Sequence, residues 1–125
     1  MKTYEKPVIS VDTGLAEGVY AASGATGPVT VKYLGVWDTW SKGGKALCSA
    51  TWTGISGTIT LNITFNDTLD QVEVEGASAQ INLSGSTATL TFSGAASDSL
   101  TIGIHLDHGT SISDLNMISY SSSVN

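Results

Sequence analysis

Apolar and polar residues alternate along most of the chain from residue 29 onward. The clearest case is residues 57–65, GTITLNITF, in which every second residue from Ile59 to Phe65 is apolar and the residues between are Thr or Asn. A period of two is typical of β-strands that bury one face and expose the other. The body of the chain is therefore expected to be built from strands.

The same period recurs in short segments separated by Gly, Asn, Asp or Ser. These segments are residues 29–37, 46–52, 57–65, 69–75, 79–84, 86–92, 99–106 and 110–120. No window of useful length has a helical period, and the segments do not repeat one another closely. About eight such strands predict an all-β antiparallel β-sandwich, either jelly-roll or immunoglobulin-like, over residues 29–125.

Residues 1–28 differ from this body in composition and in period. An apolar core of the kind found in a secretory signal peptide is lacking, because Asp12, Gly14, Glu17 and Gly18 interrupt the segment. The string YEKPVI…LAEGVYAASG resembles the short leaders of exported proteins of gut Firmicutes. Its end is also similar to double-glycine leaders, although Ala21-Ala22 or Ser23-Gly24 stands where those have Gly-Gly. The resemblance implies a leader for export; the alternative is an N-terminal arm that pairs with the body.

Composition narrows the function classes. The 125 residues contain five Lys, no Arg and eleven Asp or Glu, which gives a formal net charge of −6. Nucleic-acid binding depends on basic patches and on Arg, so a nucleic-acid partner is not expected. No apolar run is long enough for a membrane span, so insertion into a membrane is not expected either. The single cysteine, Cys48, has no internal disulfide partner and is expected to be a buried apolar residue.

All three tryptophans fall within residues 37–52. Trp52 is expected in the core, whereas exposure and burial fit Trp40 equally well, since Thr39, Ser41 and Lys42 flank it in a predicted loop. An exposed Trp offers a flat surface suited to the apolar face of a sugar ring. The candidate carbohydrate-binding residues are Trp37, Trp40, Tyr33, Asp38 and Lys42, the last two as groups that orient sugar hydroxyls.

A resemblance to known modules supports the same interpretation. The stretches VKYLGVWDTW, SATWTGISGTITLNITF and LTFSGAASDSLTIGIHL are similar to bacterial carbohydrate-binding β-sandwich modules, over about half of the body. The paired cysteines of those modules are absent. The resemblance implies the sandwich fold and a glycan ligand.

Three acidic or histidine-containing groups are candidates for catalytic or metal sites. Glu73 and Glu75 lie on one strand face, about 7 Å apart by strand rise, but Val72 and Val74 would point inward and leave both as solvent-facing charges. The other two groups are His105, Asp107, His108 and Asp114, and Asn66, Asp67 and Asp70. Neither has the spacing of a zinc site or a calcium-binding loop. No catalytic residue, metal or cofactor is expected, and the protein is not expected to be an enzyme.

The sequence therefore predicts an exported, non-catalytic β-sandwich at the cell surface or in the extracellular medium that binds a polysaccharide or other glycan. The alternative is a structural subunit of an extracellular filament or adhesin. In that case the protein would self-associate, and residues 6–13, KPVISVDT, would pair as a donated strand with a neighbour's open edge. A small secreted antigen-like or bacteriocin-related protein also fits such a leader.

Overall fold

A computed structural model of the chain describes residues 27–125, which fold into two packed four-stranded antiparallel sheets. The predicted antiparallel β-sandwich of about eight strands is confirmed. The strands are β1 (Thr30–Trp40), β2 (Gly43–Thr51), β3 (Thr58–Phe65), β4 (Gln71–Glu75), β5 (Ala79–Ser84), β6 (Thr87–Ser93), β7 (Ser99–Asp107) and β8 (Met117–Val124). The predicted leader or arm, residues 1–28, and the predicted donor strand, residues 6–13, lie outside the described residues except for Gly27 and Pro28.

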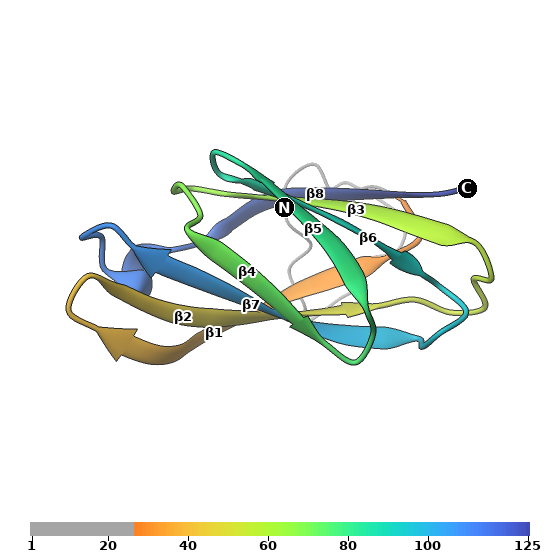
Figure 1. Ribbon diagram of the computed structural model, residues 1–125, viewed down its shortest axis with the longest axis horizontal. Helices are drawn as coiled ribbons and strands as arrows, with labels where there is room; N and C mark the ends of the chain where they lie inside the picture. Colours follow the sequence, from red (N-terminus) through yellow and green to blue (C-terminus); the bar gives the residue numbers. More distant parts are fainter. Residues whose placement is uncertain (1–26) are drawn as a thin grey trace, which may run out of the picture.

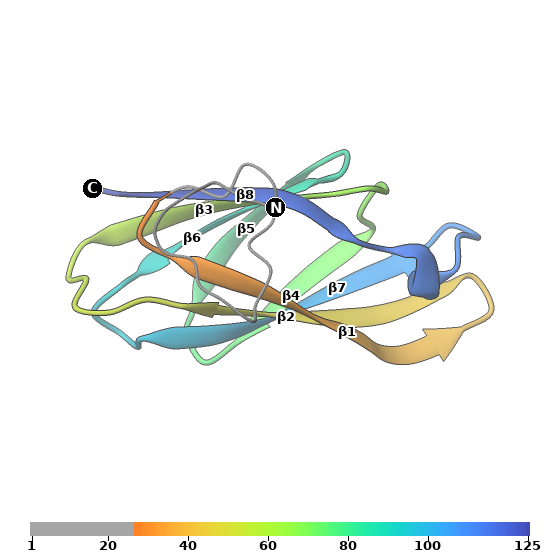
Figure 2. The ribbon, with the colours of Figure 1, turned by 180° about the vertical axis from the view of Figure 1, so that it is seen from behind.

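The two layers have the strand orders β1-β2-β7-β4 and β5-β6-β3-β8. Figure 1 shows them as a lower and an upper layer, with only the β1–β2 and β5–β6 hairpins staying within one layer. Seen from behind in Figure 2, the chain enters β1 beside the upper layer and descends into the lower one. A hydrogen bond from the Val29 amide to the Ser122 hydroxyl of β8, 3.1 Å long, holds this entry point.

The alternating pattern produces the core between the layers. Every second residue of the central strands points inward and is buried, as in Ile59, Leu61, Ile63 and Phe65 of β3 and Leu100, Ile102, Ile104 and Leu106 of β7. Between β1 and β7, β2 contributes small inward residues, Ala46, Cys48 and Ala50. Each large apolar side chain that is fully buried contributes about 1.5–3 kcal/mol. This packing is the main source of the fold's stability.

Two features close the ends of the sandwich. Trp52 is 5% exposed, packs on Phe92 with ring centroids 5.1 Å apart, and donates from its indole nitrogen to the Gly94 carbonyl at 3.0 Å. Its predicted place in the core is thus confirmed. Between β7 and β8 a short 3₁₀ helix, η1 (Ile112–Asp114), places its first residue, Ile112, and its C-cap residue, Leu115, in the core.

Three sequence-based boundaries were wrong. The segment 110–120 was predicted as one strand, but η1 occupies part of it and β8 begins only at Met117. Trp40 was predicted in a loop and Gly43-Gly44 as part of that loop, but β1 continues to Trp40 and β2 begins at Gly43, leaving Ser41-Lys42 as the turn. The longer hairpin forms because the tip pairs with β7, where Gly43 and Gly44 face Asp107 and Leu106.

No helix in residues 27–125 has both the length and the apolar character that a membrane crossing requires.

The burial of Cys48 leads to a prediction about its reactivity. Its side chain is fully buried, and this burial raises the pKa of the thiol to about 12. Because the thiolate is the reactive form, the native protein is expected to resist a thiol reagent at about pH 8, whereas the protein unfolded in denaturant reacts at the rate of an ordinary cysteine. Rapid labelling of the native protein, followed by mass spectrometry, would contradict this expectation.

Candidate functional site

The outer face of the β1-β2-β7-β4 sheet carries a shallow pocket of about 120 Å³, here called the Trp37 pocket. Its lining residues come from all four strands: Trp37, Lys45, Leu47, Glu73, Glu75, Thr101 and Gly103. They share this face because they occupy the outward positions of strands whose alternate residues fill the core. The lining therefore contains aromatic, apolar, basic, acidic and hydroxyl side chains, all of which a ligand placed here would contact.

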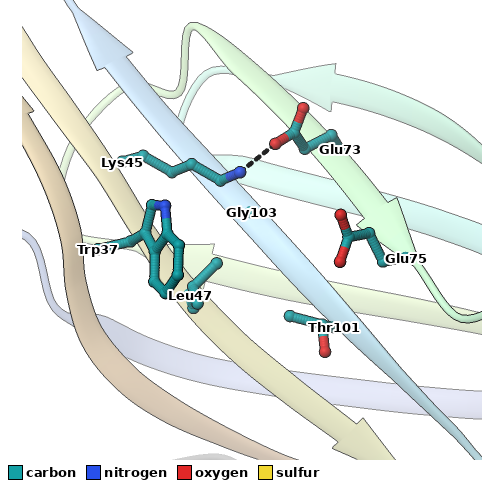
Figure 3. Close-up of a pocket in the computed structure, with 7 residues that line it drawn as sticks. All are labelled: Trp37, Lys45, Leu47, Glu73, Glu75, Thr101 and Gly103. Carbon is teal, nitrogen blue, oxygen red and sulfur yellow. Dashed lines mark hydrogen bonds and ion pairs between the residues drawn. The ribbon is translucent and has the colours of Figure 1, made fainter.

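Trp37 is exposed because β1 is irregular. The pairing of β1 with β2 shifts register twice, between Tyr33 and Gly35 and between Val36 and Asp38, so that Trp37 is an extra residue on β1. Such β-bulges bend a strand and redirect a side chain. Gly35 takes a φ of 102°, a conformation that side-chain-bearing residues rarely adopt. As a result the indole is 68% exposed and lies over β2 beside Leu47 (Figure 3).

The floor of the pocket is an ion pair that crosses a glycine. Gly103 of β7 pairs with Leu47 on one side and Glu73 on the other. Its missing side chain leaves the space in which Lys45 of β2 reaches over β7 to Glu73 of β4, as Figure 3 shows. A Cβ atom at Gly103 would lie 2.7 Å from Lys45 Cε and 3.1 Å from Glu73 Cγ, so any other residue would displace the pair.

The charges of this floor are linked to the second exposed tryptophan. His105 Nε2 lies 3.4 Å from Glu73 Oε2, without hydrogen-bond geometry. The ring of Trp40, 39% exposed, packs on the His105 ring with centroids 5.7 Å apart. The hydrogen bond from Lys45, together with the nearby His105, lowers the pKa of the Glu73 carboxyl. These neighbours favour the ionised form of Glu73. Contacts through His105, Glu73 and Lys45 connect Trp40 to the pocket that Trp37 lines.

The five residues proposed from the sequence are placed differently from one another. Trp37 lines the pocket, and Trp40 lies beside His105 on the same face. Asp38 is exposed, pairs in register with Lys45, and accepts a hydrogen bond from the Thr39 amide. Lys42 is exposed in the hairpin turn, where its carbonyl accepts from the Gly109 amide.

Tyr33 is not brought into this group. Its ring packs edge-on against Phe65 with centroids 6.5 Å apart, it is half-buried against the core, and burial raises the pKa of its hydroxyl. The reason is that its position in β1 faces Cys48, an inward residue of β2.

Four residues of the pocket were missed from the sequence: Lys45, Leu47, Thr101 and Gly103. Each stands at an outward position of its strand, so the alternation of apolar and polar residues was enough to predict that this position faces outward. The sequence does not show which strands lie beside β7 in the sheet. Only the pairing of β7 with β2 and β4 brings these residues beside Glu73. The outward orientation of Glu73 and the inward burial of Val72 are confirmed, but the ion pair with Lys45 was not predicted.

One residue of the histidine group and two of the Asn66, Asp67 and Asp70 group meet in a cluster, here called the aspartate–histidine clamp: His108, Asp67 and Asp70. His108 Nδ1 lies 2.5 Å from Asp70 Oδ2, and its Nε2 lies 3.1 Å from Asp67 Oδ1. The Asp107 amide donates to Asp70 Oδ2 at 2.5 Å. The clamp ties the loop before β4 to the turn after β7. Within residues 27–125, no group of three or more His, Cys, Asp or Glu side chains is arranged to hold a metal ion.

Both ring nitrogens of His108 face carboxylates, an arrangement that only the protonated ring satisfies with two donated hydrogen bonds. The hydrogen bond to Asp70, reinforced by Asp67, raises the pKa of His108. The hydrogen bonds from the Asp107 amide and from His108 lower the pKa of Asp70.

These two shifts predict how the clamp responds to pH. The His108 contribution is complete below the unfolded histidine pKa of about 6.5 and is lost as the pH rises through the raised folded value. The Asp70 contribution is complete above about pH 4 and is lost as the pH falls through the lowered folded value. The difference in melting temperature between the native protein and His108→Gln should therefore be largest at about pH 5–6 and shrink as the pH rises through the raised folded pKa of His108. A difference that stays constant from pH 5 to pH 9 would show that protonation of His108 contributes nothing.

No protein-family model matches this chain, and no curated protein matches it. The relation to carbohydrate-binding modules and to short-leader proteins therefore remains a resemblance, whereas the two-sheet sandwich is established by the structure itself.

Proposed function

We propose that the protein binds carbohydrate on the outer face of its β1-β2-β7-β4 sheet, with Trp37 as the main contact. The observation that carries this proposal is the 68% exposure of a tryptophan at the edge of a pocket lined by charged and hydroxyl groups. Exposing so large an apolar side chain costs free energy unless a ligand covers it. A sugar ring matches this surface because it combines an apolar face with hydroxyls at its edge.

Each part of the pocket has a role in this proposal. The sugar's apolar face stacks on Trp37, and Leu47 supports the indole from the sheet side (Figure 3). Lys45 donates hydrogen bonds to hydroxyl oxygens, and the carboxylate of Glu73 accepts hydrogen bonds from hydroxyl groups. The ion pair therefore supplies both a donor and an acceptor for sugar hydroxyls. Trp40 offers a second stacking surface, which Asp38 and Lys42 flank in sequence.

The proposed role is binding without catalysis. A glycosidase needs one carboxylic acid whose pKa is raised, so that it can donate a proton to the leaving oxygen. The pKa of Glu73 is lowered by Lys45, which is the opposite of that requirement. Glu73 and Glu75 also stand on one strand, on the same side of any ligand that covers the face.

We further propose that the protein works at the cell surface or in the extracellular medium, with residues 1–28 as its export leader or arm. The support is the low content of charged residues, 13%, the abundance of Ser and Thr, and the resemblance of the first residues to exported short-leader proteins.

Substitution of Trp37 tests the proposed function. Trp37→Ala should weaken binding to any glycan found on an array by about tenfold or more, because a buried aromatic contact is lost. Trp40→Ala should weaken it less, since Trp40 is more buried and lies outside the pocket lining. The measurement is titration calorimetry on the full chain, with circular dichroism to verify folding.

Asp98→Asn, on the exposed loop before β7, serves as a control that should leave affinity unchanged. A glycan that binds equally well to the native protein and to the Trp37→Ala variant would place the site elsewhere. If no glycan is bound by the native protein, the proposed function fails.

One observation favours the alternative of an assembling subunit. The edge strand β1 exposes Leu34 by 58% and Val36 by 45%, and edge strands with exposed apolar residues are templates for strand addition. In that case the full chain should form large assemblies, and a chain starting at Gly27 should stay monomeric when its size is measured by light scattering. Carbohydrate binding alone predicts monomers for both chains and an unchanged glycan affinity.

A further inference from the structure

The charge balance of the Trp37 pocket indicates the chemical class of its ligand. Among the residues that line the pocket, Lys45 is the only cation, and its ammonium group is paired with Glu73. The second acidic residue of the lining, Glu75, is exposed and lies on the same strand as Glu73. The lining as a whole therefore carries one negative charge in excess.

The geometry separates this excess charge from the aromatic contact. In Figure 3, Trp37 stands at one side of the pocket and Glu75 at the other, with Gly103 between them and the Lys45–Glu73 pair along one margin. The indole of Trp37 lies over β2, and Glu75 belongs to β4, two strand spacings away in the sheet order, or roughly 10 Å. A ligand that contacts both is longer than one sugar ring.

A ligand that covers the pocket removes water from the Glu75 carboxylate. Desolvating a carboxylate without a partner costs several kcal/mol in general, and a positive group on the ligand is what compensates it. A carboxylate or sulfate on the ligand would instead be repelled by Glu75 and by the chain's net charge of −6. The charge of Lys45 is already balanced by Glu73, so the pair offers such a group no net positive charge.

We propose that the ligand is an oligosaccharide with unacetylated amino sugars, whose ring stacks on Trp37 and whose ammonium group pairs with Glu75. This inference rests on the carbohydrate-binding function proposed above. The net negative charge of the chain also attracts such a ligand from a distance.

The test compares three hexasaccharides of similar size on the full-length protein at about pH 5.5, where amino sugars are protonated and glutamate is ionised. The probes are the hexamers of glucosamine, N-acetylglucosamine and galacturonic acid, and the measurement is titration calorimetry at two salt concentrations. The glucosamine hexamer should bind about tenfold or more tightly than the acetylated one, and its affinity should fall with salt. The galacturonic acid hexamer should not bind.

The variant Glu75→Gln removes the charge and keeps the shape. It should weaken binding of the glucosamine hexamer by about tenfold and leave the acetylated hexamer unchanged, whereas the control Asp98→Asn removes one negative charge outside the pocket and should affect neither. An unchanged preference in Glu75→Gln would overturn the proposed pairing.

The remaining outcomes separate this inference from the proposed function. Equal affinity for the acetylated and unacetylated hexamers, with loss of both in Trp37→Ala, would overturn the inference and leave carbohydrate binding standing. Equally tight binding of a linear tetraamine would overturn it as well, because the ammonium group alone would then be the ligand. Absence of binding to any saccharide would overturn both.

Discussion

The outer face of the β1-β2-β7-β4 sheet depends on the packing of its inner face. Because β2, β4 and β7 each bury their alternate residues against the other layer, a shift by one residue in any of them would exchange the residues that this strand contributes to the pocket for core side chains. The hydrophobic effect thus fixes the register, and the register fixes which polar groups meet on the outside. The packing of the core therefore positions the pocket residues, which all lie on strands and not on loops.

Gly103 shows how closely the two faces are connected. The residues before and after it, Ile102 and Ile104, are fully buried, while the position itself leaves room for an ion pair between the two neighbouring strands. Glycine weakens a strand interior, so its presence at the centre of a sheet marks a place where something must approach the backbone closely. Here the approaching group is the stem of Lys45.

The alternation along the chain was enough to predict the fold class, the number of strands and the outward-facing Glu73. It was not enough to predict the pocket, because a period of two states which face a residue occupies and not which strand lies beside it. Lys45 and Glu73 are 28 positions apart and meet only through β7. The aspartate–histidine clamp was not predicted for the same reason, since His108 and Asp70 come from separate loops. The bulges of β1 and the helix η1 interrupt the period, and there the predicted boundaries were wrong.

The two bulges of β1 have a consequence for how this protein can change over evolution. A bulge is a point at which a strand holds one residue more than its partner needs, so the chain can lose that residue there while the pairing on both sides is kept. Deletion of Trp37 would remove the second bulge and the indole together, while the pairing of Val36 with Ala46 and of Asp38 with Lys45 could be kept. The exposed indole on this face can thus be gained or lost by a single-codon insertion or deletion in one edge strand.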